Sequence, residues 1–132
     1  MKYDFAAEAC ALVGTPFRPQ GRDPAIGLDC VGLVLATFRI PFDSVRRDYR
    51  LRGNHRVEIE SGIARFFRPV RPGEPGDLML LMVGPDQLHL GVRTNLGFVH
   101  ADARLGRAVE TPGEPRWAVL GTFRKRRIER GI

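Results

Sequence analysis

The sequence contains little cysteine and no long apolar run, and these two shortages exclude several classes of protein. Its two cysteines, Cys10 and Cys30, are too few for a disulfide framework, and no C-x-x-C pair is present to form a structural zinc site. The longest apolar stretch, Val31 to Phe38, is far too short to cross a membrane. The first residues lack the apolar core and the small-residue cleavage site of a secretory signal, so we expect a protein made in the cytoplasm without a membrane span.

The composition is that of an ordinary globular protein, with 43% hydrophobic and 27% charged residues in a chain of 132. This length predicts a single domain over residues 1–132. The net charge of +6 comes largely from arginine, part of it gathered in a basic tail at residues 124–132. Such a run can bind nucleic acid, but the interleaved aromatic residues and the concentrated basic face of nucleic-acid modules are missing. We therefore expect a solvated terminus and no nucleic-acid partner.

The first half of the chain predicts helices. Apolar residues recur at helical spacing from Asp4 to Val13, which would pack Cys10 within a helix that ends at Gly14. A second helix is expected from Cys30 to about Arg39, although its β-branched residues leave a buried strand as an alternative. A third amphipathic pattern runs from Ile59 to Val70 and is closed by Pro69.

The second half predicts strands. Buried or alternating runs separated by turn residues cover 77–83, 88–94, 98–101, 108–111 and 119–124. Helices that come first and a meander of antiparallel strands that follows indicate an α+β domain.

The octamer Gly27 to Val34 carries the strongest chemical signal in the chain. Asp29 is suited to cap a helix, which would place Cys30 at the first helical position. The helix dipole and the open N–H groups there favour an anion, so the thiol would lose its proton more easily and become a nucleophile. The alternative is a buried cysteine in a core helix.

Two histidines in neighbouring predicted strands could complete a catalytic site. A cysteine nucleophile needs a base, and the base needs a third polar group to fix its tautomer. Cys30, His89 and His100 can fill these roles, since a tight turn between the strands would bring the two rings together. Two alternatives remain: the histidines are structural, or the three residues are ligands of a zinc ion.

Five short blocks, in this order and spacing, resemble the NlpC family of cell-wall cysteine peptidases from about residue 4 to 124. The blocks are Gly14-Thr15-Pro16-Phe17, Gly27-Leu28-Asp29-Cys30-Val31-Gly32-Leu33-Val34, Pro75-Gly76-Asp77-Leu78, His89-Leu90-Gly91-Val92 and Phe98-Val99-His100-Ala101. The resemblance implies a papain-like fold in which the cysteine opens a helix that packs on an antiparallel sheet. It also implies that Cys30 is the nucleophile, His89 the general base and acid, and His100 the orienting residue, with no cofactor. The backbone N–H of Cys30 would then form part of the oxyanion hole.

The resemblance further implies a substrate, peptidoglycan, whose stem peptides are cut between D-glutamate and the diamino acid. Within the family, the sequence is most similar to the short peptidases of phage tails and gene transfer agents. The absent signal, the insert Gly21-Arg22-Asp23-Pro24 and the arginine-rich close of the chain support this branch. It implies tail-tip or baseplate partners and action in the cell wall.

Two positions depart from the family pattern. Many members have a tyrosine where this chain has Phe17, and a serine where it has Val31. An alternative expectation is therefore a structural tail-tip component that keeps the fold and has lost useful activity.

Overall fold

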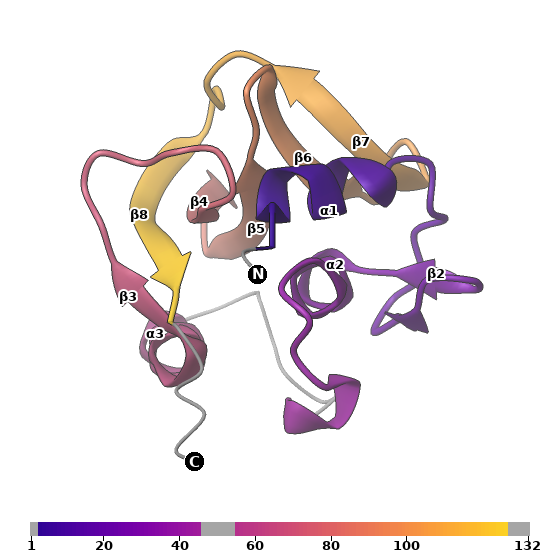
Figure 1. Cartoon of the computed structure of the whole chain (residues 1–132), viewed down its shortest axis with the longest axis horizontal. Coiled ribbons are helices and arrows are strands. Elements are labelled where there is room, and N and C mark those ends of the chain that lie inside the picture. The colour runs from indigo at the N-terminus through magenta and orange to yellow at the C-terminus, as the bar shows by residue number, and fades with distance from the viewer. Residues whose placement is uncertain (1–2, 46–54, 127–132) are drawn as a thin grey trace.

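The computed structural model describes residues 3–45 and 55–126, and it shows an α+β fold (Figure 1). Within these residues, three α-helices and a short 3₁₀ helix pack with a six-stranded antiparallel sheet. The helices are α1 (Phe5–Ala11), α2 (Cys30–Thr37), η1 (Phe42–Ser44) and α3 (Arg56–Phe66). The strands are β1 (Arg22–Asp23), β2 (Gly27–Leu28), β3 (Phe67–Pro69), β4 (Leu78–Gly84), β5 (Gln87–Arg93), β6 (Gly97–Asp102), β7 (Arg107–Pro112) and β8 (Ala118–Lys125).

Helix α2 is the central element, and it begins at Cys30 as the sequence predicts. All of its residues except Ala36 are buried, which is the pattern of a helix surrounded by protein rather than one with a solvent face. It packs against α1, β5 and β6. The strand alternative for this segment is therefore wrong, because the capped start at Asp29 and the enclosed position both favour helix.

The sheet has the order β3-β8-β4-β5-β6-β7, which corrects the predicted meander. Strands β4 to β7 follow one another as expected, but β8 returns past them and inserts between β3 and β4. The sequence identifies β8 as a strand but contains no local signal for its neighbours, since those contacts join residues about fifty positions apart.

Strand β3 replaces the last turn of the predicted third helix. Helix α3 ends at Phe66, and Phe67 already has extended backbone angles. Arg68 precedes Pro69, which disfavours helical geometry, and β8 supplies partners for the extended chain. In the segment before α2, β1 and β2 pair as a short antiparallel hairpin.

The two faces of the sheet carry different sets of side chains. Alternate residues of β4 to β6, including Leu80, Leu90 and Val99, join α2 in the main core. The opposite face carries a smaller cluster of Met79, Leu81 and Phe98, with Trp117 packed against it. His89 and His100 belong to this second face by strand alternation.

The predicted solvated tail is only partly described. Arg124 lies in β8 and makes two 2.9 Å hydrogen bonds to the buried carboxylate of Asp77, so it is a structural residue rather than part of a free terminus. Residues 127–132 lie outside the described part of the chain. Among the described helices, none is long and apolar enough to span a membrane.

Candidate active site

Cys30 lies at the first position of α2, held there by the cap that the sequence predicts. The Asp29 carboxylate accepts hydrogen bonds from the Gly32 N–H at 2.8 Å and from the Gln20 N–H at 3.0 Å. These bonds satisfy part of the first helical turn and fix the loop before it. The cysteine side chain is buried, with 3% of its surface exposed.

Burial reverses the expected effect of the helix start on the thiol. It raises the pKa of Cys30 to about 12, and the nearby Asp29 carboxylate adds to this rise. The N–H groups of Leu90, Val31 and Cys30 itself act in the opposite direction but do not outweigh burial. The predicted low pKa is therefore wrong for the resting protein, and Cys30 is a neutral thiol at neutral pH.

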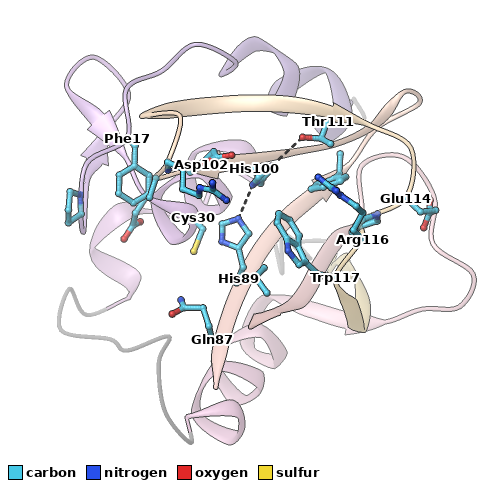
Figure 2. Close-up of a pocket in the computed structure, with 18 of the residues that line it drawn as sticks. Phe17, Cys30, Gln87, His89, His100, Asp102, Thr111, Glu114, Arg116 and Trp117 are labelled. Carbon is cyan, nitrogen blue, oxygen red and sulfur yellow. Dashed lines mark hydrogen bonds between the residues drawn. The ribbon is translucent and has the colours of Figure 1, made fainter. Parts of the chain in front are cut away.

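The two histidines meet as the sequence predicts, and a third residue continues their contact. His89 Nε2 lies 2.9 Å from His100 Nδ1, and His100 Nε2 lies 3.3 Å from the Thr111 hydroxyl (Figure 2). Because Nε2 of His89 is occupied by His100, Nδ1 is the nitrogen left to accept a proton. In that tautomer His89 Nε2–H donates to His100 Nδ1, and His100 Nε2–H donates to Thr111. The chain of contacts crosses β5, β6 and β7 and fixes the orientation of the base.

Gly91 makes room for this arrangement. The β5–β6 pairing joins Val92 to Val99 and Arg93 to Phe98, and continuing that register places Gly91 beside His100. A Cβ atom at Gly91 would lie 3.3 Å from the Val99 carbonyl oxygen and 3.4 Å from the Phe98 ring. A side chain here would therefore press β6 away from β5 at the point where the two histidines meet.

An aromatic cluster encloses the histidine pair. Phe98 stacks on His100 with ring centroids 5.0 Å apart. Trp117 meets both imidazoles edge-on, with its centroid 6.1 Å from that of His89 and 5.6 Å from that of His100. Burial lowers the pKa of His89 to about 4, with a further contribution from the His100 charge, while Asp102 acts in the opposite direction. Burial likewise lowers the pKa of His100. The base is therefore neutral at neutral pH, as the thiol is.

Cys30, His89 and His100 line one open cleft of about 1040 Å³. Figure 2 shows the Cys30 sulfur and the His89 ring in the middle of this cleft, with Phe17 on one side and Trp117 on the other. The cleft also contains polar and charged side chains, namely Gln20, Asp29, Gln87, Asp102, Arg104, Thr111, Glu114 and Arg116.

Sequence reasoning did not single out Thr111, Trp117 or Asp102 as members of this site. Thr111 reaches His100 only through the β6–β7 register, and Trp117 reaches both rings only through the path of the loop between β7 and β8. The one sequence feature that could have pointed to Trp117 is that it is the single tryptophan of the chain and lies between a proline-rich turn and the last strand.

Cys10, in contrast, lies outside the cleft. It is exposed rather than packed, and its Sγ lies 3.6 Å from a Glu110 carboxylate oxygen. Partial burial and Glu110 raise the pKa of this thiol.

Metal-binding geometry is not found in the described residues. No group of three or more His, Cys, Asp or Glu side chains within 3–45 and 55–126 is arranged to hold a metal ion.

Comparison with known proteins identifies the fold. The sequence matches no protein-family model, and a search of curated proteins found no match. Among solved structures, the chain is similar to the NlpC/p60 domain of the peptidoglycan hydrolase SagA, with a TM-score of 0.56 and 23% sequence identity. The match covers 83% of this chain and 86% of the other. The α+β arrangement of this protein, with Cys30 at the start of a helix packed on an antiparallel sheet, is therefore an NlpC/p60 fold.

Proposed function

We propose that this protein is a cysteine endopeptidase that cuts peptidoglycan stem peptides, at the bond between D-glutamate and the diamino acid. The observation that carries the proposal is the placement of Cys30 beside the hydrogen-bonded pair His89–His100 in one open cleft. The NlpC/p60 fold and the peptidoglycan hydrolase SagA, which shares it, support the choice of substrate.

The reaction begins from a neutral thiol and a neutral imidazole. The Cys30 sulfur attacks the carbonyl carbon of the scissile bond while its proton passes to His89 Nδ1. The oxyanion that forms is stabilised by the backbone N–H of Cys30. Protonated His89 then gives this proton to the leaving nitrogen, the C–N bond breaks, and a thioester remains on Cys30.

Hydrolysis of the thioester repeats the proton transfers. His89 takes a proton from a water molecule, whose oxygen attacks the thioester carbon. The C–S bond breaks, and the proton on His89 returns to the sulfur. His100 stabilises the charged form of His89 in both halves by accepting from its Nε2–H, and Thr111 holds the His100 ring in the matching tautomer.

We also propose that the protein acts from a phage tail or gene-transfer-agent particle, docked on tail-tip or baseplate proteins. The sequence feature that supports this setting is the insert at residues 21–24. In the structure this insert is held against the segment after α2, because buried Arg22 donates hydrogen bonds to the Phe42 and Val45 carbonyl oxygens. Copurification of the protein with intact particles, and its loss from tail-less ones, would test this setting.

The test of the enzymatic proposal is incubation with purified peptidoglycan, followed by mass analysis of the released fragments. Wild type should release fragments that end in D-glutamate, and Cys30→Ala should release none while keeping the melting temperature. A wild-type protein that releases no fragment, or a Cys30→Ala variant that releases the same ones, would overturn the proposal. Inhibition by EDTA that zinc reverses would point to metal-dependent chemistry instead.

A catalytically weak tail-tip component is the second candidate, and Phe17 is the observation that favours it. Phe17 lines the cleft where many NlpC peptidases have a tyrosine, and a phenyl ring donates no hydrogen bond to an oxyanion. Phe17→Tyr should raise turnover on peptidoglycan by up to about 10²-fold, since one oxyanion donor is worth roughly 10²–10³ in rate. If neither form cuts any wall preparation, the structural role is the better description. If wild type cuts briskly and the tyrosine adds nothing, another donor such as the Gln20 amide serves the oxyanion.

A further inference from the structure

We propose that Arg104 and Arg116 determine specificity by binding two carboxylates of the substrate, one on each side of the scissile bond. This inference rests on the proposed function, because it assigns residues that would select an acidic peptide at the same cleft. Both arginines line the cleft that holds Cys30, and both side chains are exposed.

The acidic side chains of the cleft are engaged by other groups of the protein and not by the guanidinium groups of these two arginines. Asp29 is engaged by backbone N–H groups at the start of α2. Asp102 accepts from the N–H groups of Arg104 and Leu105 at 2.8 and 3.1 Å, which shapes the β6–β7 turn.

Glu114, the remaining acidic residue of the cleft, is paired with Arg93 at 2.6 Å. By contrast, no hydrogen bond or ion pair joins the guanidinium of Arg104 or Arg116 to any other residue in the part of the chain that the structure describes. The acidic side chains of the cleft are therefore engaged within the protein, whereas the guanidinium groups of Arg104 and Arg116 are available to bind an anionic ligand.

The two arginines approach the cleft from different loops. Arg104 belongs to the β6–β7 turn, which lies beside Phe17 because the Phe17 N–H donates to the Gly106 carbonyl at 2.9 Å. Arg116 belongs to the loop between β7 and β8, next to Trp117. Figure 2 shows Phe17 and Trp117 on opposite sides of Cys30 and His89, so one arginine serves each half of the cleft.

The loop that carries Arg116 is held in place. The Glu114–Arg93 pair ties it to β5, and Arg93 is only 17% exposed. The Gly113 N–H donates to the Leu96 carbonyl at 2.9 Å, which ties it to the β5–β6 turn. A guanidinium on an anchored loop loses less conformational freedom when it binds a ligand than one on a free chain. Arginine is suited to this role because its planar fork binds a carboxylate through two parallel hydrogen bonds.

Binding to the Cys30→Ala protein tests the proposal without hydrolysis. The probes are a synthetic stem peptide with free carboxylates on its D-glutamyl and diamino acid residues, the two forms in which one carboxylate is amidated, and the diamide. Calorimetry should show that the acid binds about 10-fold or more tightly than each monoamide, since charge-assisted hydrogen bonds are lost. Arg104→Gln should weaken binding of the acid by a similar factor, and so should Arg116→Gln.

Pairing variants with amides assigns each arginine to one carboxylate. Arg104→Gln should bind the acid and one of the two monoamides with equal affinity, because the carboxylate amidated in that probe is the one that Arg104 binds. Arg116→Gln should bind the acid and the other monoamide with equal affinity. Arg68→Gln is the matched control, because Arg68 is an exposed arginine of β3 at the far edge of the sheet and its loss changes the net charge equally. In the hydrolytic wild-type background, the two cleft variants should raise KM and leave kcat within about twofold.

Three results would overturn the proposal: equal binding of acid and diamide, no binding of any probe, or an Arg68→Gln effect as large as those of the cleft variants. Failure of the proposed function is a separate outcome. In that case wild type would cut no stem peptide, while the Cys30→Ala protein would still distinguish acid from amide through Arg104 and Arg116.

Discussion

At the scale of single residues, the structure reverses what the sequence predicts for the two cysteines, namely a packed Cys10 and a Cys30 thiol that loses its proton easily. Cys30 is buried with a pKa of about 12, whereas Cys10 is exposed. Iodoacetamide at neutral pH should therefore label Cys10 several times faster than Cys30 in the native protein, since Cys10 is exposed to the reagent whereas Cys30 is buried as a neutral thiol. Mass analysis of a labelling time course measures the two rates.

The Cys10→Ala variant is the control for this experiment. It should leave one slowly labelled thiol, keep full activity and change the free energy of unfolding by only about 0.5 kcal/mol, as exposed positions do. Faster labelling of Cys30 would show that substrate-free protein already holds the thiolate.

The histidine pair predicts an unusual pH profile. Since burial lowers the pKa of His89 to about 4, kcat/KM should stay high as the pH falls below 6.5 and decline only near pH 4. The acid limb should move to higher pH in His100→Asn, because His100 lowers the pKa of His89 when it is itself protonated at low pH, whereas asparagine carries no charge at any pH. This variant should keep a measurable fraction of the activity, whereas His89→Ala should lose as much as Cys30→Ala.

Rates on a soluble stem peptide between pH 3.5 and 9 would measure these profiles. A decline of wild-type activity between pH 7 and 9 would contradict the neutral pair, because a preformed thiolate–imidazolium pair loses activity when its imidazolium loses the proton. Equal and complete loss at both histidines would remove the distinction between base and orienting residue.

At the scale of elements, the close approach of β5 and β6 predicts a specific sensitivity at Gly91. Gly91→Ala should lower kcat by about tenfold or more, because the added Cβ would press on β6 beside His100 and lengthen the contact between the imidazoles. Gly62→Ala is a matched control in α3, where nothing lies within 4 Å of the added Cβ. It should raise the free energy of unfolding by about 0.5–1 kcal/mol and leave kcat unchanged. Normal kcat in Gly91→Ala would show that the strands adjust without disturbing the histidines.

The elements also show which features of this molecule can be predicted from sequence. The start of α2 at Cys30 depends on its immediate neighbours, since Asp29 supplies the cap within the same turn, and this boundary was predicted correctly. The meeting of His89 and His100 was predicted because their strands are consecutive and joined by a tight turn.

Other features depend on partners far along the chain. The insertion of β8 beside β4 and the extended conformation of Phe67 to Pro69 both require strand pairings that no local pattern encodes. The pKa of Cys30 was predicted with the wrong sign because helix position is a local property, whereas burial depends on the whole fold.

At the scale of the whole molecule, buried His100 and half-buried His89 should make stability depend on pH. The pKa of each imidazole is lower in the folded protein than its ordinary value of 6.5, so the unfolded chain binds more protons between those limits. The free energy of unfolding should therefore fall as the pH decreases from about 6.5 toward 4. For His89 alone the loss is at most about 3 kcal/mol, at 1.36 kcal/mol for each pKa unit.

Urea unfolding at several pH values would measure this dependence. His89→Gln should flatten the slope between pH 6.5 and 4, because glutamine does not titrate. Asp29, whose pKa burial raises, contributes with the opposite sign in both proteins and cancels in the comparison. Parallel curves for the two proteins would mean that His89 is hydrated in the native state.

The contacts from His89 through His100 to Thr111 cross three consecutive strands, and so they depend on how those strands are aligned. His100 stands opposite Val109, and Thr111 stands opposite Phe98. A slip of one residue between β6 and β7 would turn alternate side chains to the other face and separate the imidazole from its hydroxyl. Such a misaligned molecule could keep its helices, much of its core and an ordinary circular dichroism spectrum, yet be inactive. Turnover per mole of protein would then report the fraction of a refolded preparation whose strands are correctly aligned, since only those molecules are active.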